Sequence, residues 1–111
     1  MTIDFNNIPE QAQEHFKGGE GTVYIAACAQ KDNKIMRVRI PAEASIGMHI
    51  HETNSETYMV LQGTARVTMQ DGTTETVSAG QVHHCPQGCG HITANAGPED
   101  LILFAMVPEH G

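Results

Sequence analysis

The sequence predicts an all-β protein whose short strands form an antiparallel barrel or sandwich. Apolar or β-branched residues recur with a period of two along nine short segments, and Gly, Pro, Asn and Asp separate these segments. A chain of 111 residues that is 40% apolar is long enough for one core and too short for two, so we expect one domain. The predicted strands are residues 22–29, 34–40, 46–51, 57–62, 64–70, 73–78, 81–85, 90–95 and 100–107.

The first part of the chain, residues 1–20, is predicted to be an N-terminal arm with one short helix near residues 9–17. Asn7 can cap such a helix, Pro9 suits its first turn, and a glycine pair follows at its end. The remaining residues, 21–111, are assigned to a single barrel domain. Its clearest hairpin turns at Asp71-Gly72, because this pair supplies the positive φ that a tight turn needs.

Composition and charge exclude several classes of function. The chain carries 6 Lys and Arg against 13 Asp and Glu, a formal charge of −7, so nucleic acid is not expected as a partner. No apolar run approaches the length needed to cross a bilayer, and the N-terminus does not resemble a secretory signal, so no membrane partner is expected. Three cysteines, an odd number, fit reduced thiols better than a disulfide framework. A cytoplasmic protein is the expectation.

Two histidines near the middle of the chain are candidates for metal binding. His49 and His51 are separated by one residue, so on a strand both side chains leave the same face and can share an ion. Glu56 follows the turn-like segment ETNS and would begin the next strand, where it can supply a carboxylate oxygen. A His-x-His pair alone is a weak indication, because single histidines and glutamates are mostly solvated.

The segment GQVHHCPQGCGHITAN carries a more specific pattern. Gly80, Pro86, Gly88, His91 and Asn95 stand at the spacings Gly-x5-Pro-x-Gly-x2-His-x3-Asn, which match in full the second motif of the cupin family. The chain therefore resembles the cupins.

The first cupin motif, Gly-x5-His-x-His-x3-4-Glu-x6-Gly, is matched with one departure. His49, His51, Glu56 and Gly63 stand at the required spacings, but Glu43 occupies the place of the opening glycine. The turn before this strand can therefore differ from that of the family, whereas the metal ligands are untouched.

The resemblance implies an antiparallel double-stranded β-helix, the cupin or jelly-roll barrel, with one divalent ion of iron, manganese, nickel, cobalt or zinc inside it. A six-coordinate ion held by four side chains would keep two positions open for a ligand, whereas four-coordinate zinc would close the site. The implied metal ligands are His49, His51, Glu56 and His91.

Other side chains are expected to line a pocket beside the metal. His83 and His84 leave opposite faces of their strand, and Val82, which shares the parity of His84, is interpreted as a core residue. His84 is therefore the histidine expected to face the pocket. The expected pocket-lining residues are Tyr58, His84, Thr93 and Asn95.

The cysteines of HHCPQGCGH raise an alternative, a small zinc knuckle. Cys85 and Cys89 are spaced Cys-x3-Cys, whereas a knuckle usually has Cys-x2-Cys or four ligands clustered in sequence. We therefore interpret Cys28 and Cys85 as packing residues, treat Cys89 as a small hydrophobe, and expect His91 to be the only metal ligand of this stretch.

Three functions remain open at this stage. The first is a metal-dependent enzyme, an oxygenase, isomerase or lyase that acts on a small oxygenated compound. The second is a non-catalytic module that binds or senses a metal-coordinating small molecule, and the third is a barrel with a purely structural metal. In the segment 34–40 the arginines alternate with apolar residues and are expected to face outward, which leaves the pocket few cations and makes a phosphorylated sugar a poor fit.

A homodimer is also expected. The segments VYIAACA and IMRVRIP carry apolar residues on more positions than one small barrel can easily bury. The resemblance to small cupins also implies a dimer, because members of that family commonly pair as dimers. The alternative is that the N-terminal helix covers this surplus and the chain is monomeric.

Overall fold

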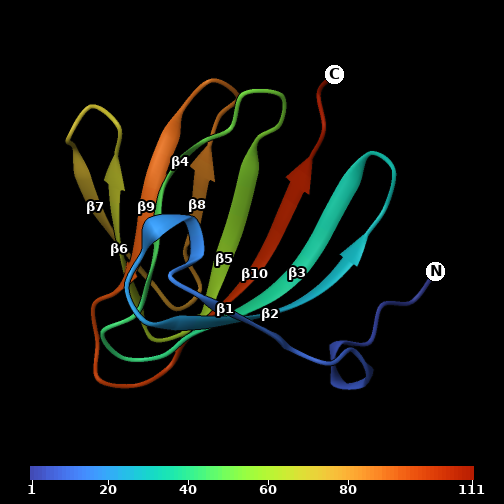
Figure 1. Ribbon diagram of the computed structural model, residues 1–111, viewed down its shortest axis with the longest axis horizontal. Helices are drawn as coiled ribbons and strands as arrows, with labels where there is room; N and C mark the ends of the chain where they lie inside the picture. Colours follow the sequence, from blue (N-terminus) through green and yellow to red (C-terminus); the bar gives the residue numbers. More distant parts are fainter.

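The computed structural model describes residues 1–111 and consists almost entirely of antiparallel strands (Figure 1). One sheet has six strands in the order β1-β2-β3-β10-β5-β8, and the other has four in the order β4-β9-β6-β7. This is the all-β fold that the sequence predicts. The strands are β1 (Gln11–Glu14), β2 (Thr22–Ala29), β3 (Asn33–Ile40), β4 (Ser45–Ile50), β5 (Glu56–Gln62), β6 (Thr64–Met69), β7 (Thr74–Ser78), β8 (Val82–Cys85), β9 (Gly90–Asn95) and β10 (Leu101–Pro108).

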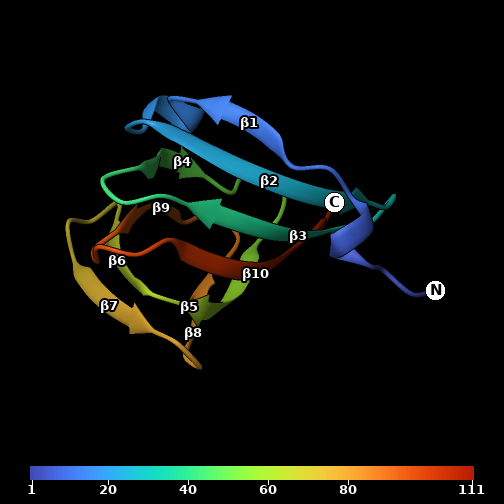
Figure 2. The ribbon, with the colours of Figure 1, turned by 90° about the horizontal axis from the view of Figure 1, so that it is seen from below.

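All nine predicted strands are present, as β2 to β10, with bounds within one residue of those predicted. Alternate residues of both sheets point into a shared core, and Figure 2 shows the strands surrounding this interior. Met36, Val38 and Ile40 are buried in it, whereas Arg37 and Arg39 leave the opposite face of β3, as their alternation predicts.

The helix predicted near residues 9–17 is wrong. Gln11–Glu14 instead forms β1, an edge strand that pairs antiparallel with β2. Single 3-10 turns, η1 (Phe5–Asn7) and η2 (Phe16–Gly18), flank it, and Asp4 caps the first of them. The sequence QAQE offers no apolar stripe for a helix to bury, and so short a helix is marginal in water. The open edge of β2 satisfies the backbone of this segment instead.

None of these helical turns is long and apolar enough to pass through a lipid bilayer.

The turn before β4 keeps a glycine-like backbone although its motif glycine is replaced. Glu43 has a φ of 69°, in the left-handed region that costs an L-residue about 1–2 kcal/mol. The amide of Ala44 donates to the carbonyl oxygen of Pro41 at 3.0 Å and closes this turn. Glu43 thus accepts local strain, and β4 still enters the barrel with His49 facing inward.

Candidate metal centre

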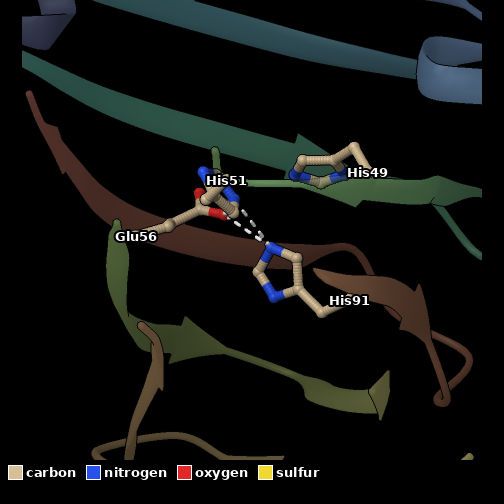
Figure 3. Close-up of side chains that lie close together, drawn as sticks. All are labelled: His49, His51, Glu56 and His91. Carbon is tan, nitrogen blue, oxygen red and sulfur yellow. Dashed lines mark hydrogen bonds and ion pairs between the residues drawn. The ribbon is translucent and has the colours of Figure 1, made fainter. Parts of the chain in front are cut away.

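Four side chains from three strands and one loop converge inside the barrel (Figure 3). His49 lies on β4, His51 follows it directly, Glu56 begins β5 and His91 lies on β9. One ligand atom from each lies within 4.8 Å of the others. His91 Nε2 lies 3.0 Å from Glu56 Oε1 and 3.2 Å from His51 Nε2. The structure therefore brings together all four residues that the resemblance implies as ligands.

Strand pairing fixes this convergence. His49 is the direct partner of His91 in the β4–β9 ladder, and a register shift lies between Ile46 and His49. The amide of His51 donates to the carbonyl oxygen of Cys89 at 3.0 Å, which extends the pairing past the end of β4. Ile50, between His49 and His51, faces outward, so both imidazoles point into the same interior space.

Each imidazole uses its Nδ1 atom in a hydrogen bond to the protein. His49 Nδ1 donates to the carbonyl oxygen of Gly47 at 2.9 Å, and His51 Nδ1 donates to Asn54 Oδ1 at 2.7 Å. His91 Nδ1 lies 3.0 Å from His83 Nε2. The oxygen acceptors fix one proton of His49 and one of His51 on Nδ1, so in the neutral imidazoles the Nε2 lone pairs are free to bind an ion.

This donor set fits a cation. Nitrogen lone pairs and a carboxylate held close together repel one another unless an ion or protons lie between them. Three imidazoles and one carboxylate suit iron, manganese, nickel, cobalt or zinc. The side chains present therefore suit a divalent metal ion.

The ionisation of Glu56 and His49 also suits metal binding. Burial alone raises the pKa of Glu56, but hydrogen bonds from His51 and His91 outweigh it and lower the pKa to about 2. Burial lowers the pKa of His49, so this imidazole is neutral at pH 7. The hydrogen bond to Glu56 raises the pKa of His51, which a bound cation would oppose.

The centre opens into a cavity of about 530 Å³. Its lining includes three of the four candidate ligands, His49, His51 and Glu56, and Lys17 and Lys34 are the cations in its wall. Much of the remaining wall is apolar, with contributions from Met36, Val38, Ile46 and Leu103.

A close backbone approach places Lys17 in this wall. A Cβ atom at Gly47 would overlap the carbonyl oxygen of Lys17 and lie 2.7 Å from the amide nitrogen of Gly19. A Cβ atom at Gly19 would likewise overlap the carbonyl oxygen of Ser45. The two glycines thus allow η2 to pack against β4 just before His49.

Of the expected pocket-lining residues, Tyr58 and Thr93 line the cavity. The Tyr58 hydroxyl lies 3.0 Å from Thr93 Oγ1, and burial raises the pKa of Tyr58 well above its ordinary value. Asn95 does not line the cavity. Its amide nitrogen donates to the carbonyl oxygens of Ile40, at 2.9 Å, and Glu99, at 2.7 Å, so the side chain supports the loop after β9.

The expectation that His84 faces the pocket is wrong. His84 is exposed and lies 2.8 Å from Thr57 Oγ1, whereas His83 is buried beside His91. The reason is that Val82 is not a core residue: it is 54% exposed, and His84, on the same face of β8, points outward with it. The β5–β8 ladder pairs inward-facing Tyr58 with His83. Because direct cross-strand partners share a face, His83 points inward with Tyr58, and this register is set by the fold rather than by any local signal in the sequence.

The cysteines stand apart from the cluster, whose members are three histidines and a glutamate. Cys85 is buried and its Sγ lies 3.6 Å from the carbonyl oxygen of Cys89, while Cys28 is partly buried on β2. Burial raises the pKa of the Cys85 thiol to about 11. Its protonated state at pH 7 is that of a packing residue, in line with the interpretation of the sequence.

Comparison with known proteins decides the family. The sequence model of the Cupin domain matches residues 36–107. The chain belongs to the cupin family.

Several proteins resemble this cupin over most of its length. An oxalate-binding protein of Thermotoga maritima is 29% identical, with 96% of this chain and 93% of the relative aligned. The crystal structure of a predicted oxalate decarboxylase from Thermotoga maritima superimposes with a TM-score of 0.91 at 26% identity, covering 98% of this chain and 99% of the other. The Cnp3 cupin domain of Schizosaccharomyces pombe, with a TM-score of 0.80 at 19% identity over 98% of this chain and 74% of its own, shows the shared fold alone.

Proposed function

We propose that this cupin holds one divalent metal ion with His49, His51, Glu56 and His91 and binds a small carboxylate through that ion. The observation that carries the proposal is the convergence of the four ligand atoms beside a cavity that three of the four residues line. In a six-coordinate ion these side chains leave two positions for the oxygens of a ligand.

The charge of the centre favours an anionic ligand. A divalent ion bound to neutral imidazoles and the single carboxylate of Glu56 keeps one net positive charge in a buried setting. Lys17 and Lys34 in the cavity wall add positive charge. Both lysines are compatible with an anionic ligand such as a carboxylate.

The shape and polarity of the cavity narrow the ligand further. The metal-binding side chains in the wall are polar and much of the remaining wall is apolar, so we expect the ligand to direct its oxygens toward the metal ligands. Small dicarboxylates and 2-hydroxy or 2-oxo acids meet this requirement, because they chelate a metal with two adjacent oxygens. A relative that is named an oxalate-binding protein supports this class.

A metal-dependent oxygenase, isomerase or lyase is the second candidate. The open coordination positions favour it, since a bound metal supplies Lewis-acid or redox chemistry. The chain itself offers little acid–base chemistry at this site. Glu56 is the only carboxylate in the cavity wall, and the raised pKa of Tyr58 keeps its hydroxyl protonated at pH 7. The side chains would therefore mainly bind and orient the substrate.

Calorimetric titration of oxalate into the metal-free, Mn²⁺-loaded and Co²⁺-loaded protein tests the proposal. We expect binding only to a loaded form, and we expect His91→Ala to abolish both metal and oxalate binding. The absence of oxalate binding by both loaded forms, or equal binding by the metal-free protein, would contradict the proposal. Assaying the same samples for formate and carbon dioxide separates the two candidates, because binding without turnover favours the non-catalytic one.

A further inference from the structure

A row of three polar side chains connects the metal centre to the surface. His91 is fully buried, and its Nδ1 lies 3.0 Å from Nε2 of His83, which is 3% exposed. His83 Nδ1 in turn contacts a carboxylate oxygen of Glu75, whose side chain is 51% exposed. We call these three residues the Glu75 relay.

The relay joins the two sheets where their backbones do not pair. Glu75 lies on β7, an edge strand of the four-stranded sheet, and His83 lies on β8, an edge strand of the six-stranded sheet. His91 lies on β9, back in the four-stranded sheet. Both contacts therefore cross from one sheet to the other, and they hold His91 from the side opposite its Nε2 atom.

The direction of the hydrogen bonds follows from the chemistry of the ends. If His91 uses Nε2 for the metal, its Nδ1 carries the proton and donates to His83 Nε2. His83 then has its own proton on Nδ1 and donates it to the Glu75 carboxylate, which only accepts. One arrangement of protons satisfies every member of the row and leaves the His91 Nε2 lone pair beside His51 and Glu56.

Without the carboxylate this arrangement loses its anchor. His83 can then carry its proton on Nε2, where it donates to His91 Nδ1 and moves the His91 proton to Nε2. The His91 Nε2–H would donate to Glu56 Oε1, 3.0 Å away, and His91 would no longer be a ligand. The two tautomers of the His83–His91 pair thus correspond to a metal-binding state and a hydrogen-bonded state.

We propose that Glu75 and His83 are positioning residues that fix the tautomer and orientation of His91 for metal binding. The inference rests on the metal centre of the proposed function, and it assigns a role to two residues that the cupin motifs do not specify. A carboxylate that accepts from a histidine row also raises the basicity of the ligand, and loss of such partners typically weakens metal affinity about 10- to 100-fold.

The test compares the parent with Glu75→Ala, Glu75→Gln and a matched control, Glu99→Gln. Glu99 is also exposed, and its side chain makes no hydrogen bond or ion pair, so Glu99→Gln controls for loss of a surface charge. Competition with a chromophoric chelator measures Co²⁺ affinity. We expect the Co²⁺ affinity of Glu75→Ala to be about 10-fold or more below that of the parent. Glu75→Gln keeps an acceptor oxygen without its charge, so its Co²⁺ affinity should lie between those of the parent and Glu75→Ala. The affinity of Glu99→Gln should match that of the parent.

Nitrogen-15 NMR of the Zn²⁺-loaded and metal-free proteins provides a second readout that a merely structural role would not change. We expect the Zn²⁺-loaded parent to show His83 and His91 protonated on Nδ1, and metal-free Glu75→Ala to show a mixture of tautomers at His83. Unchanged Co²⁺ affinity and unchanged tautomers in Glu75→Ala would overturn the proposal, even if the metal-free variant melted at a lower temperature.

The outcomes separate this inference from the proposed function. If the parent binds Co²⁺ but no oxalate, the proposal of a small carboxylate as the bound molecule fails. The Glu75 relay is then still tested by the Co²⁺ affinities of the variants. If the parent binds both and Glu75→Ala binds Co²⁺ equally well, only the relay fails. If the parent binds no metal, the metal centre fails and the relay fails with it.

Discussion

His51 is held at the metal centre by a second row of hydrogen bonds. Its Nδ1 donates to Asn54 Oδ1 at 2.7 Å, and Asn54 Nδ2 donates to Glu109 Oε1 at 3.1 Å. Thr53 Oγ1 donates to the other oxygen of the same carboxylate at 3.0 Å. Glu109, near the C-terminus, thereby orients the Asn54 amide, which in turn orients His51.

We expect Asn54→Ala to weaken Co²⁺ affinity about 10-fold, because His51 would lose the acceptor that fixes its Nδ1 proton. Chelator competition measures the effect. Thr53→Val is the matched control, since it removes a hydrogen bond to Glu109 without touching His51. Equal affinity losses in the two variants would mean that Asn54 acts through the fold rather than through His51.

Glu56 predicts how the metal-free protein responds to acid. Its pKa in the fold, about 2, lies below the ordinary value of 4.5. Ionised Glu56 therefore stabilises the fold above pH 4.5, and this stabilisation is lost as the pH falls from 4.5 toward 2. The shift corresponds to a free energy of unfolding on the order of 3 kcal/mol. Urea unfolding at about pH 7 and about pH 3 should show a smaller acid-induced loss in Glu56→Gln than in the parent, and equal losses would contradict the prediction.

Single residues also explain what the sequence could and could not predict about the site. The four ligand positions were predictable because each motif lies within one short segment, where strand periodicity keeps His49 and His51 on one face. His83 and Asn54 were not identified, because their roles depend on partners that the fold supplies. Asn54 meets Glu109 across 55 positions of sequence, and no local spacing reveals this contact.

Among the elements, the strands of the barrel were predictable and the N-terminal segment was not. Alternating apolar residues and Gly or Pro punctuation mark β2 to β10, because one face of each strand is buried. The segment that forms β1 carries no such alternation. Its structure is decided by the open edge of β2, a tertiary effect that overrides the capping residues in the sequence.

The packing of η2 against β4 leads to a prediction for Gly47. A Cβ atom there would overlap the backbone of Lys17 and crowd that of Gly19, and neither backbone can rotate away. We expect Gly47→Ala to destabilise the protein by about 1–3 kcal/mol, as overpacking does, and to weaken metal binding by displacing His49. Gly97→Ala is the control, because its Cβ would meet nothing closer than Asn95 Oδ1 at 3.9 Å. Urea unfolding and Co²⁺ titration measure the two effects, and a Gly47→Ala protein as stable as Gly97→Ala would contradict the argument.

Over the whole molecule, the two outer regions of the six-stranded sheet differ. Residues of the N-terminal arm contact the outer surface of β3 and β10, at Arg39 and Phe104. Glu10 pairs with Arg39 at 2.9 Å, Arg39 lies over the Tyr24 ring at 4.1 Å, and Phe5 packs edge-on against Phe104. The chain therefore covers part of its own apolar surplus, but with an extended arm rather than a helix.

The outer surface formed by β5, β8 and β10 around Met106 is not covered by the N-terminal arm. Met59 and Val82 are direct partners in the β5–β8 ladder, and Leu61 lies on the same face of β5. Met106 continues the surface on β10. We call these four residues the Met59 patch. Large apolar side chains clustered on an exposed sheet face mark interaction surfaces more often than isolated ones do.

We therefore keep the homodimer as a prediction and assign the Met59 patch as its interface. The inner face of β5 carries Glu56 and Tyr58, so a dimer formed through the outer face leaves the cavity free to receive a ligand. Light scattering of the parent should give about twice the 12.0 kDa of one chain. Val82→Glu should restore the single-chain mass, because a two-fold interface would bury two unpaired carboxylates. Met48→Glu, which changes an exposed methionine on β4 in the other sheet, should remain dimeric. If the parent has the mass of a single chain, the dimer is ruled out. If Val82→Glu is still dimeric, the dimer interface does not lie at the Met59 patch.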